Sequence, residues 1–259
     1  MSAAVVVTPA ERDVFVARMH ARAVRRVARS VGRASLVVGS IFWGIFLVVT
    51  VAVPLVVHQA GGVMGGGVLT GAEYAAPWFA LSLGMIALGS LVVPHLAAGG
   101  TRRSLAVGGL GAALVAGLAY GVAYGLLLLV ERGLFGALGW TWDQLGSGLD
   151  AGGAWLVVTV VASAISVAVY TLVGMAAQAA YRTHGVWRGT ALLLPGLVLL
   201  VLVDHATRSG AFADAFGGLG LGGDHAPAAL GLLQAFVVLA LAAGWLWWQV
   251  RTLRLRPTR

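Results

Sequence analysis

Residues 36–57 read LVVGSIFWGIFLVVTVAVPLVV and contain no Asp, Glu, Arg, Lys or His. A helix rises about 1.5 Å per residue, so a stretch of this length crosses the roughly 30 Å hydrocarbon core of a bilayer unaided. The preceding residues, 8–33, read TPAERDVFVARMHARAVRRVARSVGR and carry seven arginines. A long basic segment before an apolar run of this length is not a cleavable signal peptide, and it predicts a retained membrane-spanning helix.

Five further runs free of ionisable side chains follow, which gives 36–57, 77–93, 106–129, 155–178, 190–203 and 229–248. Four of the six runs reach roughly 20 residues, and the second and fifth reach that length with residues 74–76 and 187–189. The sequence predicts an all-α integral membrane protein with six transmembrane helices at about 35–57, 74–95, 105–130, 155–179, 187–204 and 229–250. In this division, 1–34 form an N-terminal region and 35–259 form the transmembrane domain.

The arginines lie in alternate connecting segments. The segments before the first run, between the second and third, between the fourth and fifth, and after the sixth hold 7, 2, 2 and 4 arginines, whereas the other loops hold only Arg132 and Arg208. Seven of the nine acidic residues lie in those other loops. Because arginine concentrates on the cytoplasmic side of membrane proteins, both termini are expected to be cytoplasmic.

Composition excludes a soluble protein. The chain is 59% hydrophobic and 10% charged, with a mean hydropathy of +0.93. Its net charge of +8 is explained by topology and by attraction to anionic membrane lipid, so no nucleic acid is expected as a partner. Cysteine is absent, which excludes disulfides and thiolate sites. The chain uses Arg without Lys and is rich in Ala, Gly and Val, which indicates a GC-rich coding sequence. This bias predicts a bacterial source, and hence the bacterial plasma membrane as the location.

A basic amphipathic helix is predicted before the first span. Thr8, Pro9 and Glu11 have the pattern of a capping box at a helix start. On a helix, Arg18, Arg22, Arg25 and Arg29 fall on one face, and Val16, Met19, Ala23, Val27 and Val31 fall on the opposite face. This segregation predicts an elbow helix, over 9–32, that lies in the membrane interface and binds anionic lipid. The alternative is a short cytosolic helix whose arginines serve orientation alone.

Polar residues inside the runs are few. The runs hold no ionisable side chain, which argues against an ion-coupled carrier and against a membrane hydrolase, so no catalytic residue is assigned. Thr159, Ser163, Ser166 and Tyr170 form a stripe on one helix face. This stripe either lines a substrate path or bonds within the helix bundle. Gly117, Gly121 and Gly125 recur every four residues and predict a close helix–helix seam.

The loop over 204–228 combines an apolar, glycine-rich stretch with two Asp-His pairs, Asp204-His205 and Asp224-His225. Two carboxylates and two imidazoles would suffice for zinc, but adjacent residues rarely bind one ion together, so no metal is expected. Whether this loop re-enters the membrane stays open at this point.

Three features now converge: a basic helix before the first of six spans, a short arginine-bearing turn after the second, and a long apolar loop before the sixth. Together they resemble the permease subunit of bacterial type-2 ATP-binding-cassette (ABC) exporters. In that family the turn after the second span docks on the ATPase, often with a Gly-x-x-Arg-Arg pattern. Here the turn reads HLAAGGTRRS over 95–104, so the resemblance implies a coupling role for Gly99, Thr101, Arg102 and Arg103.

The resemblance further implies a second copy of the chain, or a paralogue, and a cytosolic ABC ATPase that binds ATP and magnesium. The chain has no lysine and therefore no phosphate-binding loop of its own. The implied cargo is a hydrophobic or amphiphilic compound, such as a drug, a peptide antibiotic or a lipid, moved out of the cell. The alternatives are a membrane scaffold or regulator, an unrecognised membrane enzyme, and, for Arg102 and Arg103, a charge that serves orientation alone.

Overall fold

The computed structural model describes residues 8–142, 149, 151–213 and 227–253. In this part of the chain the elements are helices: α1 (Pro9–Gln59), α2 (Thr70–Ala97), α3 (Arg102–Ala137), the 3-10 turn η1 (Gly152–Ala154), α4 (Trp155–Ala191), α5 (Leu193–Thr207) and α6 (Ala228–Arg251). The predicted all-α class is confirmed. Five of the described helices are long and apolar enough to cross a membrane, whereas α5 is apolar but has only 15 residues.

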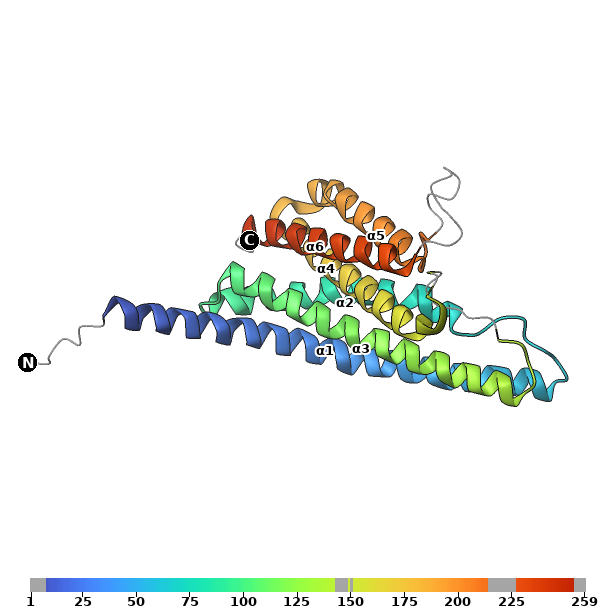
Figure 1. Ribbon diagram of the computed structural model, residues 1–259. Helices are drawn as coiled ribbons and strands as arrows, with labels where there is room; N and C mark the ends of the chain where they lie inside the picture. Colours follow the sequence, from blue (N-terminus) through green and yellow to red (C-terminus); the bar gives the residue numbers. More distant parts are fainter. Residues whose placement is uncertain (1–7, 143–148, 150, 214–226, 254–259) are drawn as a thin grey trace, which may run out of the picture.

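Helix α1 begins as predicted, at the capping box. The Thr8 side chain accepts from the Glu11 backbone N–H at 3.3 Å, and Glu11 accepts from the Thr8 N–H at 2.9 Å. The helix then runs for 51 residues without a break, at about 77 Å in length, and it crosses the expected boundary at residue 34. The expected separate elbow helix is therefore wrong for this structure: the basic segment and the first span share one axis (Figure 1).

Packing against α3 explains why α1 continues. Val27 and Val31 are buried, and Gly108 of α3 leaves room for Val27, because a Cβ at Gly108 would collide with it. This contact surface continues beyond Gly32 to Gly39, where a Cβ would collide with Tyr120 of α3. A single glycine lowers the stability of a helix by only about 1 kcal/mol. The packing of α1 against α3 on both sides of Gly32 therefore outweighs the effect of this glycine.

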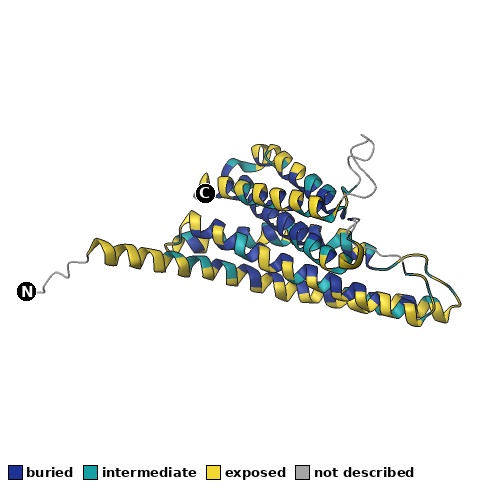
Figure 2. Ribbon diagram, in the orientation of Figure 1, coloured by how far each residue is buried: buried dark blue, intermediate teal, exposed yellow. Residues whose placement is uncertain are grey.

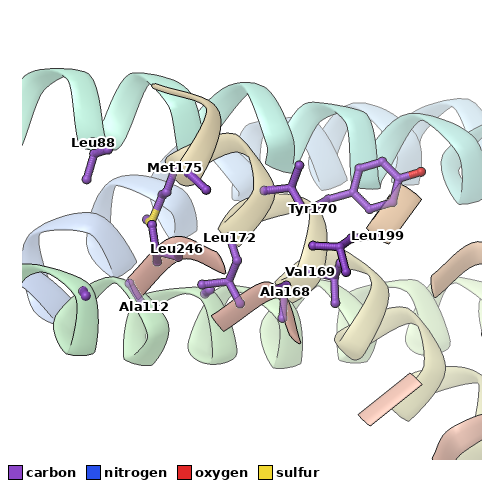
Figure 3. Packing of buried hydrophobic residues seen from close by; sticks show 14 of the residues in the cluster. Leu88, Ala112, Ala168, Val169, Tyr170, Leu172, Met175, Leu199 and Leu246 are labelled. Carbon is purple, nitrogen blue, oxygen red and sulfur yellow. The ribbon is translucent and has the colours of Figure 1, made fainter. Parts of the chain in front are cut away.

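Helix α4 lies at the centre of the bundle, in contact with α2, α3, α5 and α6. The predicted glycine seam is confirmed: Gly117 and Gly121 of α3 lie so close to α4 that a Cβ would meet the carbonyl oxygens of Ala164 and Val160. Close approach through glycine is a common way of packing helices in membranes. Figure 3 shows the core around α4, where Met175 and Leu172 lie among side chains of α2, α3 and α6.

From α1 to α6, with α5 included, each helix runs in the direction opposite to the one before it (Figure 1). The α2–α3 turn and the α4–α5 reversal therefore lie at the same end as the start of α1 and the end of α6, which we call the arginine-rich end. Gly185, at φ 77°, makes the reversal, after which helical structure resumes at residue 186 and is interrupted only near Leu192. Arg132 and Arg208 lie at the other end, which we call the loop end.

The outer faces of the bundle are exposed (Figure 2), and many of the residues on them are large and apolar. Examples are Ile41, Ile45 and Val48 on α1 and Leu118 and Leu126 on α3. A soluble monomer rarely exposes so continuous an apolar surface, whereas lipid tails cover it in a membrane.

Candidate functional site

A groove of about 920 Å³ lies at the arginine-rich end, between the first turns of α1, the end of α2 and the start of α3. Phe15, Val16, Met19 and Leu91 form its apolar part, and its basic and polar part includes His20, Arg22, Arg26, His95 and Arg103. Two regions that the sequence singled out separately therefore share one site: Arg22 of the basic helix lines this groove together with Gly99 and Thr101 of the α2–α3 turn and Arg103 of α3.

The basic face of α1 is open. Arg18, Arg22, Arg25 and Arg29 are all exposed, and of these only Arg22 lines the groove. The opposite face is divided, because Val27 and Val31 pack against α3 whereas Val16 and Met19 are exposed at 57% and 46%. The amphipathic pattern is thus explained partly by packing on α3 and partly by the groove.

The α2–α3 turn is held by local hydrogen bonds. Thr101 caps α3 and exchanges bonds with Ser104 at 3.0 and 3.1 Å, and His95 at the end of α2 bonds Ser104 at 2.9 Å. Gly99 adopts φ 79°, a left-handed conformation that favours glycine. The conformation of the turn and the start of α3 are therefore sufficient to explain why glycine occupies position 99 and threonine occupies position 101. The turn is only 98–101, so Arg102 and Arg103 occupy the first turn of α3 rather than a separate coupling helix.

Arg102 and Arg103 are both exposed. Among the residues that the structure describes, none forms an ion pair or a hydrogen bond with either guanidinium group. Among the described residues, their donors are therefore unengaged.

The stripe on α4 does not line an open path. Thr159, Ser166 and Tyr170 are buried, and Ser163 is half-buried. Ser163 and Ser166 line a small cavity of about 20 Å³, which is far too small for a drug or a peptide. This geometry favours packing over transport as the role of the stripe within one chain.

Three acidic residues are more buried than the sequence indicated. Glu131 and Asp204 have no exposed surface, and Glu73 is half-buried. Glu131 accepts backbone N–H bonds from Val68 at 2.6 Å and Leu69 at 3.2 Å, and an indole N–H from Trp142 at 3.3 Å. Each acid lies within four residues of an apolar run, a spacing that could have indicated burial.

Glu73 and Asp204 together hold the segment after α5. Glu73 accepts the Gly210 N–H at 3.2 Å, and Asp204 accepts the Phe212 N–H at 3.2 Å. Tyr170 donates to the same Asp204 oxygen at 2.8 Å, so the polar stripe of α4 ends on this acid. Gly210, at φ 86°, lies so close to Asp204 that a Cβ would collide with the carboxylate.

The structure lends no support to zinc at the Asp-His pairs. Asp204 is engaged by Tyr170 and Phe212, and the His205 ring lies 3.3 Å from the Ala213 carbonyl oxygen. In the part of the chain that the structure describes, no three His, Cys, Asp or Glu residues are grouped as metal ligands. Asp224, His225 and most of the loop over 204–228 lie outside the described residues, so the structure does not test whether this loop re-enters the membrane.

Compared with known protein families, with curated proteins and with solved structures, the chain matches none. Its five long apolar helices and its lipid-suited outer faces indicate the class of multi-pass helical membrane proteins.

Proposed function

We propose that this chain is the permease subunit of a bacterial ABC exporter, which moves a hydrophobic or amphiphilic compound out of the cell with a separate ATPase subunit. The observation that carries the proposal is the groove at the arginine-rich end. There the basic helix and the α2–α3 turn meet, and Arg102 and Arg103 begin α3 beside it with their guanidinium groups exposed. The resemblance places the ATPase contact at this turn.

The proposal includes six spans with both termini in the cytoplasm of a bacterium. Residues 186–191 and α5 together exceed the roughly 20 residues that a span needs, with only a turn at Leu192 between them. Every described arginine except Arg132 and Arg208 lies in the N-terminal part of α1, in or next to a connection at the arginine-rich end, or, for Arg251, at the end of α6. The positive-inside rule assigns that end to the cytoplasm.

Docking at the groove suits the chemistry of arginine. Each guanidinium offers five N–H donors in a fixed fork that fits carboxylate and carbonyl groups. We expect Arg102 and Arg103 to contact such groups on the ATPase, and the apolar part of the groove to take an apolar side chain from the same partner. Gly99 and Thr101 contribute indirectly, because they fix the turn that presents these arginines.

The cargo path is assigned to the surface between two copies, or between this chain and a paralogue. Two cavities inside the bundle have volumes of only about 20 and 10 Å³, whereas sites for drug-sized molecules are roughly 300–1,000 Å³. The exposed aliphatic faces of α1 and α3 offer the apolar wall that such a path requires.

Paired substitutions at the turn test this proposal. With the ATPase copurified, R102K/R103K keeps the charge that orients the chain but loses the forked geometry, whereas R102A/R103A loses both. We expect normal insertion, weaker ATPase association in the Lys pair and a greater loss in the Ala pair. Arg33→Ala, an exposed arginine at the same end that does not line the groove, is the matched control. Parent-like association of both pairs would contradict docking at this turn.

A further inference from the structure

One side of the contact between α1 and α3, which we call the α1–α3 surface, carries two exposed arginines. The helices meet there at small residues, because a Cβ at Gly111 of α3 would lie only 3.8 Å from the Ala28 Cβ of α1. With 3.6 residues per turn, Arg25 lies about 60° and Arg29 about 100° round α1 from Ala28, in the same sense. Both are exposed, and neither lines the groove. We call Arg25 and Arg29 the arginine pair.

The α3 half of this surface is aliphatic. Val107, Leu114 and Leu118 lie within about 60° of Gly111 round α3 and are exposed at 43%, 45% and 60%. Viewed down these two parallel helices, the arginine pair lies clockwise of the contact on α1 and the three aliphatic residues lie counterclockwise of it on α3, so both groups face the same side. A ligand that suits this surface therefore needs a negative group and an apolar chain.

The α1–α3 surface reaches the membrane boundary at the arginine-rich end. A Cβ at Gly109 would lie 3.8 Å from Leu246 of α6, and the next two residues toward that end, Trp247 and Trp248, are 40% and 50% exposed. Exposed tryptophans mark the level where hydrocarbon meets headgroups. The glycine before Gly109 meets Val27 of α1, so the arginine pair straddles the level of these tryptophans. The apolar run of α3 begins at the same level, at residue 106.

Protein groups do not supply a negative charge at this level. Among the described residues, none forms an ion pair or a hydrogen bond with the arginine pair. Glu11 and Asp13 are the only acidic residues before Glu73 in the sequence, and Asp13 precedes Arg25 by three helical turns, or about 18 Å. The other seven acids fall in connecting segments of the opposite end. A second copy of the chain therefore brings no acid to this level, and a cytosolic protein lies beyond the tryptophans.

We propose that the α1–α3 surface binds one anionic phospholipid from the leaflet at the arginine-rich end. Its phosphate lies between Arg25 and Arg29, which are one helical turn apart and each offer a fork of N–H donors. An acyl chain runs toward the loop end past Leu114 and Leu118. A free phosphate leaves the aliphatic half uncovered, and a zwitterionic lipid brings a positive charge of its own to the arginines.

The bound lipid stabilises the contact between α1 and α3. Ala28 and Gly111 bury little apolar area at this level, so an acyl chain adds apolar contacts to both helices at once. The phosphate also offsets the repulsion between two arginines that are one turn apart. The lipid contact thus lies on the straight helix α1 rather than on an in-plane elbow helix. This inference does not depend on the transport function.

Thermal unfolding of the purified, delipidated full chain in a neutral detergent tests the proposal. Phosphatidylglycerol is compared with phosphatidylcholine that has the same acyl chains, and sodium phosphate forms a third arm. A ligand that binds only the folded chain raises the unfolding midpoint as its concentration rises. We expect a larger rise with phosphatidylglycerol than with phosphatidylcholine, and none with phosphate. Equal responses to the two lipids, or a phosphate response as large as that to phosphatidylglycerol, would overturn the proposal.

R25Q/R29Q removes the arginine pair, and R12Q/R18Q is the matched control, because it removes two exposed arginines of α1 that lie beyond the tryptophan level. Loss of the pair should weaken the apparent affinity for phosphatidylglycerol by about tenfold or more, because charged hydrogen bonds to the phosphate are lost. The control should respond like the parent. Arg29→Gln alone takes the place of the double variant if R25Q/R29Q does not fold. A parent-like response without these arginines, or an equal loss in the control, would contradict a lipid site at this surface.

Discussion

Tyr170 of α4 donates a hydrogen bond of 2.8 Å to Asp204 of α5, and both side chains are fully buried. This contact joins two features that the sequence placed in different contexts, a polar stripe within a span and an acid in a loop. It also ties the central helix to the segment that follows α5, because the same Asp204 oxygen accepts the Phe212 N–H.

Tyr170→Phe is expected to destabilise the chain by about 1–2 kcal/mol, since it removes a hydrogen bond to a buried acid. Unfolding in mixed micelles with rising SDS measures this change. The control is Tyr181→Phe, whose hydroxyl bonds Thr190 at 3.3 Å nearer the surface and should matter less. Equal effects of the two substitutions would count against a special role for the Tyr170–Asp204 contact.

Gly121→Ala should cost about 1–3 kcal/mol, because the added Cβ would collide with the Val160 carbonyl oxygen in the α3–α4 seam. Gly133→Ala lies on the same helix with no neighbouring atom within 4 Å, and it should be neutral or stabilise by up to about 1 kcal/mol. The same SDS unfolding assay compares them. If Gly121→Ala is tolerated as well as Gly133→Ala, the two helices do not pack as described.

The continuity of α1 can be measured with spin labels, because the natural chain has no cysteine to replace. Cysteines at the exposed positions Ala17 and Ser40 lie 23 residues apart, which corresponds to about 35 Å between backbones on a straight helix. A right-angled elbow at Gly32 would shorten this to about 25 Å by the same helical rise. Pulsed electron paramagnetic resonance distinguishes the two distances, and a main peak at the shorter one would restore the separate elbow helix.

Topology follows from the distribution of arginines, 15 against 2. A reporter that is active only in the cytoplasm should work when fused after Arg259. The same reporter inserted near Ser147 should be silent. The reverse pattern would invert the orientation and place the groove outside the cell.

The apolar runs predicted where the helices lie, because a membrane leaves few alternatives for a long uncharged segment. The run 77–93 falls within α2 and the run 106–129 within α3, and the α3 seam follows from the spacing of its glycines. Helix ends were less predictable: α1 extends far beyond its apolar run, because arginine and alanine favour helices and Gly32 alone does not end one.

Burial of the acids could not be read from local pattern. Asp204 contacts a tyrosine that is 34 residues away, and Glu73 contacts a backbone amide that is 137 residues away, so both environments depend on how the helices pack. Counting ionisable residues inside the runs missed these acids, because they lie at the ends of the runs. The groove has the same origin, since residues 13–30 and 91–104 meet only when α1 packs beside α2 and α3.

The central claim, a permease driven by a separate ATPase, is tested most directly by purifying the tagged chain in mild detergent from the cells that encode it. Bound proteins are identified by mass spectrometry, and ATP hydrolysis is measured in the same preparation. We expect an ABC ATPase in stoichiometric amount, with hydrolysis that depends on magnesium and is reduced in the R102A/R103A chain. A folded chain that purifies without any ATP-hydrolysing partner would contradict the account.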